Sequence, residues 1–152
     1  MTSRKKYPTI RMPASSVRLC ICSSVLVIMT ATAEPVMLDC PNQPNCVSSK
    51  ASDPERLVAP LKYSGDAGYA LERLATIVDA TTGAAVVSLD QGHLRTTFAS
   101  RLFSFVDDVE FVVRDGDLID VRSMSRLGCY DFGVNRARVE KIRAHFESPS
   151  KR

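Results

Sequence analysis

The stretch Phe105-Val-Asp-Asp-Val-Glu-Phe-Val-Val-Arg-Asp-Gly-Asp-Leu-Ile-Asp-Val-Arg-Ser123 decides the fold, because apolar and polar side chains alternate on both sides of a glycine turn. This pattern is typical of an antiparallel hairpin with one packed face and one wetter face. A two-residue turn would mix apolar and charged side chains on each face. We therefore predict a three-residue loop, Arg114–Gly116, with the glycine in its left-handed last position.

The register of this hairpin follows from the loop. It sets Phe111 opposite Ile119 on the packed face. On the face away from the core, it sets Asp108 opposite Arg122, with Glu110 on the diagonal. The hairpin is therefore predicted to carry an ion pair on its outer face.

A second hairpin is predicted upstream, where Ala85–Asp90 and His93–Phe98 flank a two-residue Gln91-Gly92 turn. This turn places three pairs on one face, namely Leu89 with Leu94, Val87 with Thr96 and Ala85 with Phe98. The alternate residues are more polar, as expected for a sheet that is covered on one side.

The remaining elements complete a small α+β domain. Arg56–Tyr63 is predicted as a first strand, and Asp66 is placed to cap a helix that ends at Thr81–Gly83. A last helix is predicted over residues 135–146, with Val139, Ile142 and Phe146 facing inward. The order β-α-β-β-β-β-α predicts a two-layer sandwich, in which both helices cover one face of a five-stranded antiparallel sheet.

Residues 1–33 have the three parts of an export signal. A basic stretch precedes the apolar run Leu19–Met29, and small residues follow at Ala31-Thr32-Ala33. The apolar run is shorter than the roughly twenty residues that span a bilayer. We therefore expect cleavage after Ala33, no membrane span in the mature protein, and a periplasmic or extracellular location.

The mature chain carries no basic excess. Residues 34–152 contain 15 Lys and Arg against 17 Asp and Glu. A field of this sign gives no reason to expect nucleic acid as a partner.

Residues 34–55 are polar and interrupted by four prolines, which predicts an extended arm before a domain at residues 56–148. In an oxidising compartment Cys40 and Cys46 are predicted to form a disulfide, leaving Cys129 as a free thiol. A bond between Cys46 and Cys129 is the alternative. No metal site is predicted, because the cysteine spacing does not match a zinc motif.

The densest run of unusual residues is Arg122–Arg138, with four arginines in 17 residues. Arg136 and Arg138 begin the last helix, where the helix dipole disfavours cations, so we expect negative groups nearby. Two sources are open: internal carboxylates of a structural network, at Asp107, Asp108, Glu110, Asp120 and Asp131, or an external carboxylate or phosphate. The candidate ligand-binding residues are Arg122, Ser123, Ser125, Arg126, Tyr130, Asp131, Asn135, Arg136, Arg138, Asp108 and Glu110.

Three blocks of the chain resemble a known family. The blocks Cys40–Ser49, Asp107–Phe111 and Val121–Glu140 are similar, in the same order, to the signature blocks of the domain of unknown function 1499 family. The resemblance covers essentially the whole mature chain. It implies a small domain, often exported, with no established activity. The chain departs from the family pattern after Gly128, where Cys129-Tyr130 replaces an aromatic followed by a small residue.

Two hypotheses about function follow. The first is a non-catalytic binding or assembly module for a protein partner or a small anionic ligand, because no serine or cysteine has a histidine placed to activate it. No catalytic residue and no cofactor are assigned. The alternative is a small hydrolase of an anionic substrate, with Arg122, Arg126 and Arg136 as a clamp and Asp108 or Asp131 as general base.

The signal segment generates a direct prediction. Export should remove residues 1–33 and leave a protein that begins at Glu34. Intact-mass measurement of the exported protein checks this. A product in the membrane fraction that retains Leu19–Met29 would contradict it.

Overall fold

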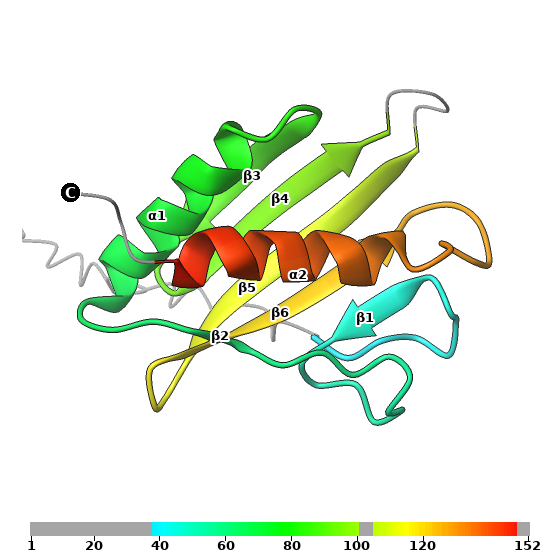
Figure 1. The fold of residues 1–152 in the computed structure, drawn as a ribbon, viewed down its shortest axis with the longest axis horizontal. Helices are drawn as coiled ribbons and strands as arrows, with labels where there is room; N and C mark the ends of the chain where they lie inside the picture. Colours follow the sequence, from blue (N-terminus) through cyan, green and yellow to red (C-terminus); the bar gives the residue numbers. More distant parts are fainter. Residues whose placement is uncertain (1–37, 101–104, 149–152) are drawn as a thin grey trace, which may run out of the picture. The chain divides into compact units, whose positions relative to one another are not determined.

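The two predicted hairpins form four consecutive strands of a six-stranded antiparallel sheet (Figure 1). The computed structural model describes residues 38–100 and 105–148. The strands are β1 (Cys46–Ser48), β2 (Leu61–Lys62), β3 (Ala84–Asp90), β4 (His93–Ala99), β5 (Val106–Arg114) and β6 (Leu118–Ser125). The order across the sheet is β1-β6-β5-β4-β3, and β2 pairs with the same edge of β6 as β1 does.

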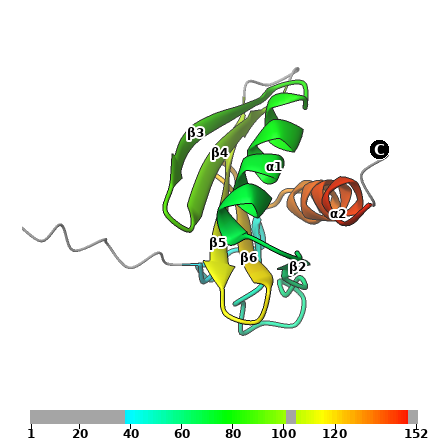
Figure 2. The same ribbon diagram turned by 90° about the vertical axis from the view of Figure 1, so that its left-hand side faces the viewer.

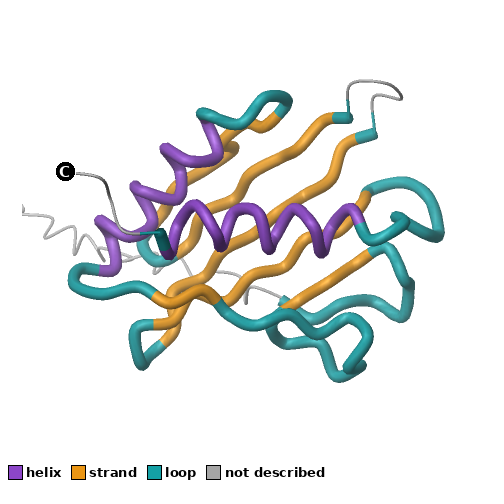
Figure 3. The backbone as a smooth tube through the Cα atoms, viewed as in Figure 1, coloured by secondary structure: helices purple, strands orange, loops and turns teal. Residues whose placement is uncertain are grey.

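Two helices cover one face of this sheet. Helix α1 (Ala67–Asp79) packs against β3 and β4, and α2 (Val134–Glu147) packs against β6 (Figure 1). The view from the side shows both helices on the same side of the sheet (Figure 2), and the tube drawing shows the loops that join the helices and strands (Figure 3). The predicted α+β class and the placement of both helices on one face are confirmed. Neither helix of the described part of the chain is long and apolar enough to cross a membrane.

The core lies between the sheet and the two helices. Its large, fully buried side chains are Phe111, Phe146, Leu61, Leu71, Leu74, Leu94, Ile119, Val78, Val109, Val121 and Val139. Val139, Ile142 and Phe146 face inward from α2, as their spacing predicts. Burial of these apolar surfaces fixes the face of each strand that turns toward the helices.

Helix α1 begins and ends where its sequence predicts. The side chain of Asp66 accepts a hydrogen bond of 2.8 Å from the amide of Tyr69, which satisfies a free donor of the first turn. Beyond the helix, Gly83 has a φ of 81°, a conformation that disfavours other residues.

The hairpin formed by β3 and β4 departs from its predicted register after a bulge. The Gln91-Gly92 turn and the Leu89–Leu94 pair are as predicted, but the register shifts between Val86 and Ser88. Thr96 therefore pairs with Val86 in place of Val87, and Phe98 with Ala84 in place of Ala85. The bulge leaves Val87 exposed and lets Val86 pack against the core, which alternation alone did not predict.

The hairpin formed by β5 and β6 has the predicted loop length but not the predicted loop position. Its loop is residues 115–117, because Arg114 still pairs with Leu118 and Asp117 adopts a left-handed φ of 57°. Every pair therefore moves by two residues, so that Phe111 lies opposite Val121. A shift of two keeps each side chain on its face, and the predicted inner and outer faces are correct. Asp108 lies opposite Met124, and the predicted Asp108–Arg122 pair is wrong.

The segment before residue 56 contributes to the sheet. Cys46–Ser48, predicted as part of an extended arm, is strand β1 and pairs with β6. The strand predicted at Arg56–Tyr63 is regular only at Leu61–Lys62. Strands β1 and β2 are too short to show an alternation of apolar and polar residues, and prolines interrupt the sequence around them. The predicted signal segment, residues 1–33, lies outside the described residues.

The predicted disulfide is present. Cys40 and Cys46 are bonded, with their Cα atoms 5.7 Å apart. Cys129 is an exposed free thiol in the described part of the chain. The pairing of Cys46 with Cys129 is therefore not the one formed.

Gly83 and Gly92 have the same left-handed backbone conformation but different surroundings. Alanine substitutions at these two positions therefore distinguish the cost of backbone strain from the cost of a steric clash. A Cβ at Gly83 would lie 2.7 Å from the carbonyl oxygen of Ala99, whereas a Cβ at Gly92 meets nothing within 4 Å. Gly92→Ala should destabilise the protein by about 1 to 2 kcal/mol through left-handed strain alone. Gly83→Ala should cost about 1 to 3 kcal/mol more, because backbone must move. Urea unfolding of both variants measures the difference, and equal losses would contradict the close approach.

Candidate functional site

The candidate residues predicted from Arg122–Arg138 do not converge on one point. Successive side chains of β6 point to opposite faces of the sheet. Ser123 is fully buried beneath α2, whereas Arg122 and Arg126 pair with carboxylates of β5 on the opposite face. Beyond β6, Tyr130 is exposed on a loop. The structure thus divides the predicted site among a buried network, the open face and a loop.

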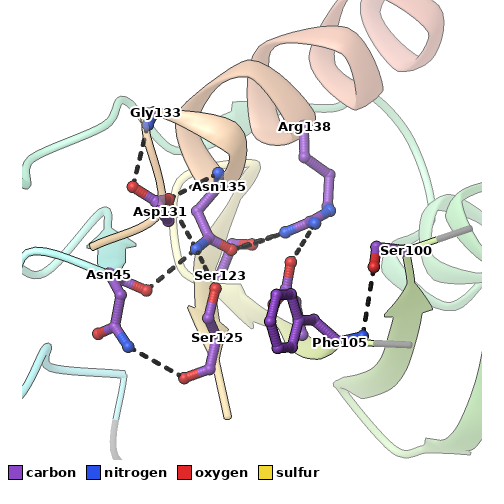
Figure 4. Close-up of polar contacts among 10 residues, drawn as sticks. Asn45, Ser100, Phe105, Ser123, Ser125, Asp131, Gly133, Asn135 and Arg138 are labelled. Atoms are coloured by element: carbon purple, nitrogen blue, oxygen red, sulfur yellow. Dashed lines mark hydrogen bonds and ion pairs between the residues drawn. The ribbon is translucent and has the colours of Figure 1, made fainter. Parts of the chain in front are cut away.

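The buried part is a polar network around the start of α2, which we call the Asn135 network (Figure 4). Its members are Asn45, Asp107, Ser123, Ser125, Asp131, Asn135 and Arg138. Asn135 and Ser123 have no solvent-exposed surface, and Asn45 is 2% exposed. Buried polar groups stabilise only when they are paired, so this network determines which local conformation is allowed.

The carboxamide of Asn135 is the centre of this network. Its nitrogen lies 3.0 Å from the Ser125 hydroxyl, 3.0 Å from the Asn45 carbonyl and 2.8 Å from Asp131 Oδ2. Its oxygen accepts hydrogen bonds of 2.6 Å from both the Ser123 hydroxyl and Arg138 Nη1. One side chain therefore joins β6, α2 and the residue before β1.

Asp131 caps helix α2. The N-cap residue, Gly133, has no side chain to satisfy the first amides of the helix. Asp131 accepts hydrogen bonds from the amides of Gly133, at 3.0 Å, and Asn135, at 2.8 Å. The carboxylate also compensates the positive end of the helix dipole. Both of its oxygens are engaged, so Asp131 is not poised as a general base.

Arg138 connects α2 to strand β5. Its guanidinium forms an ion pair with Asp107 and donates to Ser123 Oγ at 3.0 Å. It also lies over the ring of Phe98, 5.0 Å from its centroid. Of the two sources of negative charge that the sequence leaves open for Arg138, the structure shows an internal carboxylate, that of Asp107.

Arg136 binds backbone oxygen atoms in place of an acid. It donates to the carbonyls of Leu57, at 3.0 Å, and Glu55, at 2.7 Å. Two turns later, Arg143 donates to the carbonyls of Ala59 and Pro60. The two arginines hold residues 55–60 against α2. The expected negative groups near the helix start are thus carbonyl dipoles for Arg136, the Asp107 carboxylate for Arg138, and Asp131 for the helix amides.

The open face of the sheet carries the other two arginines of the Arg122–Arg138 block, and both form ion pairs. Arg122 pairs with Glu110 at 2.9 Å, and Arg126 makes two hydrogen bonds with Asp108, at 2.7 and 2.8 Å. The hydrogen bonds that Arg126 donates to Asp108 raise the pKa of Arg126. These pairs replace the predicted Asp108–Arg122 contact, since the loop shift moves β6 by two residues. The structural network expected between the arginines and internal carboxylates exists, with different partners.

Residues 126–134, which we call the aromatic loop, display apolar side chains to solvent. Phe132 is 87% exposed, Tyr130 61%, Leu127 66% and Val134 50%. The rings of Tyr130 and Phe132 pack edge to face, with centroids 5.0 Å apart. Tyr130 also borders a hollow of about 280 Å³ next to the disulfide. The aromatic residue of this block is therefore at the surface and does not pack in the core.

The backbone of the aromatic loop is nevertheless tightly held. Gly128, Phe132 and Gly133 have positive φ values of 90°, 53° and 78°. The Gly128 carbonyl accepts a hydrogen bond of 2.5 Å from the side chain of Asn45. Asp131 fixes the other end of the loop at the start of α2. The loop therefore has a defined shape despite its exposed side chains.

Among the described residues, no serine hydroxyl forms a hydrogen bond with a histidine. His93 pairs with Val112 of β5, which pairs in turn with Asp120 of β6. Asp120 lies near the start of β6, whereas Ser125 is its last residue. Burial lowers the pKa of His93, and its Nε2 is buried without a hydrogen-bond partner among the described residues. His145 lies in the last turn of α2. Across residues 38–100 and 105–148, no three His, Cys, Asp or Glu side chains gather as metal ligands.

A family model described as Protein of unknown function (DUF1499) matches residues 37–146. The chain belongs to the DUF1499 family. The resemblance of its three blocks to that family is therefore confirmed. The match covers every strand and nearly all of α2. Comparison with curated proteins gives no match, and neither does comparison with solved structures.

All three of these DUF1499 blocks meet in the Asn135 network. Asn45 belongs to the first block, Asp107 to the second, and Ser123, Ser125, Asp131, Asn135 and Arg138 to the last. Sequence reasoning proposed these last five as ligand-binding residues and missed Asn45. The contact between Asn45 and Asn135 joins residues 90 positions apart, and no local pattern signals such a pair. The available signal for Asn45 was its place in the Cys40–Ser49 block, next to Cys46.

The two kinds of polar cluster should respond differently to mutation. Asn135→Ala leaves several buried partners unsatisfied and should lower the free energy of unfolding by about 3 kcal/mol or more. Arg126→Ala removes an exposed ion pair and should change stability little. Chemical denaturation of both variants checks the contrast. A loss for Arg126→Ala that matches that of Asn135→Ala would contradict the assignment of the network as the structural centre.

Proposed function

We propose that this protein is an exported, non-catalytic binding module that docks a protein partner on its aromatic loop. The observation that carries the proposal is Phe132, a large apolar side chain that is 87% exposed on a left-handed backbone. Neither feature contributes to stability. Exposed apolar groups on a rigid support are typical of interaction sites.

The cost of this arrangement supports a role in binding. A residue other than glycine in the left-handed region costs about 1 kcal/mol or more. Strained positions of this kind persist where the surrounding structure holds them. Here Asp131 and the start of α2 provide that support on both sides of Phe132. A glycine at this position would relieve the strain but would remove the exposed ring.

A protein partner fits the loop better than a small anion does. The arginines that would clamp an anion are already engaged, Arg122 by Glu110, Arg126 by Asp108 and Arg136 by backbone carbonyls. Protein interfaces are instead enriched in aromatic side chains and arginine. The aromatic loop contains both, since Arg126 is its first residue. Anionic lipid surfaces attract clusters of free cations, which the loop does not present.

The hydrolase alternative has less support. Asp131 is engaged by amides of α2, and Asp108 is engaged by Arg126. Arg136 and Arg126 lie in separate parts of the molecule, Arg136 on residues 55–57 and Arg126 on β5. A general base needs a free carboxylate facing the substrate. The pairings thus favour a binding role.

The proposal that the protein is exported rests on the signal-like segment at residues 1–33 and on the cysteine chemistry. A disulfide between Cys40 and Cys46 persists in compartments outside the reducing cytoplasm. The free thiol of Cys129 lies in the aromatic loop and gives a natural attachment point there.

A crosslinking experiment tests the binding role. A benzophenone maleimide attached to Cys129 should give, on illumination in the native envelope fraction, a discrete adduct with another protein. Phe132→Asn should abolish it and change stability by no more than about 1 kcal/mol, because asparagine tolerates the left-handed conformation. Val87→Ser removes an exposed apolar side chain from β3 and is the matched control that should keep the adduct.

Two results would contradict the proposal. One is the absence of any protein adduct from the labelled chain. The other is an adduct that survives Phe132→Asn unchanged, since the ring would then contribute nothing to docking. An adduct with a second copy of this chain would identify the partner as the protein itself.

A further inference from the structure

The disulfide loop, residues 40–46, is attached directly to the aromatic loop. The side-chain nitrogen of Asn45 donates to the carbonyl of Gly128 at 2.5 Å and to that of Ser125 at 3.3 Å. The Asn45 carbonyl accepts from the Ser125 amide at 3.1 Å and from Asn135 Nδ2 at 3.0 Å. Asn45 therefore contacts the chain just before, within and just after residues 126–134.

The disulfide is the main restraint on the chain that leads to Asn45. Cys46 has no exposed surface, whereas residues 41–44 are exposed. Beyond the bond, these residues are held by Arg56, which donates to the Pro41 carbonyl at 2.5 Å and to Asn42 Oδ1 at 3.4 Å. Without the covalent link, the exposed segment would retain only these surface contacts. The position of Asn45 would then depend on its own hydrogen bonds and on the pairing of β1 with β6, which begins at the next residue.

We infer that the Cys40–Cys46 disulfide is a redox-sensitive clamp that keeps the aromatic loop in its binding shape, an inference that rests on the proposed function. When the bond is intact, Asn45 is fixed beneath the loop and the loop is ordered before any partner arrives. Pre-ordering lowers the entropy cost of association. When the bond is reduced, the aromatic loop loosens and the partner binds more weakly.

The chemistry needs a dithiol reductant. Its thiolate attacks Sγ of Cys40, because Cys46 is fully buried. The S–S bond breaks, a mixed disulfide forms at Cys40, and the Cys46 sulfur leaves as a thiolate that takes up a proton. The second thiol of the reductant then attacks the mixed disulfide and releases Cys40 as a thiol. Two electrons and two protons pass to the protein, and the reductant becomes a cyclic disulfide.

Loosening should be local. Neither cysteine belongs to the apolar core between the sheet and the helices. The bond closes a short segment, with a sequence separation of 6, and the pairing of β3 through β6 does not involve it. Reduction should therefore release the two loops while the central sheet keeps its hydrogen bonds.

Hydrogen exchange read by mass spectrometry tests the clamp on the mature protein, with and without dithiothreitol. Reduction should speed exchange of amides in residues 125–135 by about tenfold or more, and leave β4 and β5 unchanged. The double variant Cys40→Ser with Cys46→Ser should reproduce the reduced state without reductant. Asn45→Ala should loosen the same residues with the disulfide intact, and Cys129→Ser should behave as the wild-type protein does.

Each outcome decides a separate point. Unchanged exchange in residues 125–135 on reduction would overturn the clamp, and so would equal loss of protection across the whole sheet. If the exchange changes but no crosslinked partner exists, the clamp stands and the proposed function fails. If a partner adduct forms equally well with and without dithiothreitol, the loop binds its partner but the disulfide does not regulate it.

Discussion

The hydrogen bonds of the Asn135 carboxamide are the constraint on which the rest of this structure depends. They are made where no water can replace them, so each group in the network needs its partner. Five other residues contact this one side chain, and they come from β6, from α2, from the loop between them and from the residue before β1. The end of the sheet, the start of the last helix and the disulfide loop therefore assume one mutual arrangement.

This arrangement explains why a polar, arginine-rich block need not be an active site. Arg138, Arg126 and Arg122 each meet a carboxylate on β5, and Arg136 meets backbone carbonyls. The arginine charges that the sequence concentrates here are therefore paired within the domain. The exposed apolar side chains of the aromatic loop take no part in these pairings. Its exposed rings on a fixed backbone are therefore the feature that calls for an explanation outside the domain.

Local patterns predicted the elements whose signals are local. The Asp66 cap, the Gln91-Gly92 turn and the inward face of α2 each depend on residues within a few positions of one another, and each is found. The predictions failed where the insertion or displacement of one residue changes the register of paired strands. A bulge near Val87 and a loop displaced to residues 115–117 both moved the register without changing the apolar pattern. Ion-pair partners depend on register, so the displaced loop led to the wrong partners for Arg122 and Asp108.

The site was harder to predict than the fold for a related reason. Ser123, Ser125 and Asn135 were chosen because polar residues gather there, yet the chain alone does not say that they face a buried interior. Asn45 was missed because its partners are 80 to 90 positions away. Only the folded sheet, in which β1 lies beside β6, brings the two blocks together.

The side-chain protons of Asn135 offer the most direct test of this account. Nuclear magnetic resonance can compare the exchange of its carboxamide protons with those of Asn42, an exposed asparagine in the same protein. A buried, fully paired carboxamide should exchange at least about a hundredfold more slowly than the exposed one, and only through unfolding. Exchange of the Asn135 carboxamide as fast as that of Asn42 would show that the network is open to water, and would contradict its role as the structural centre.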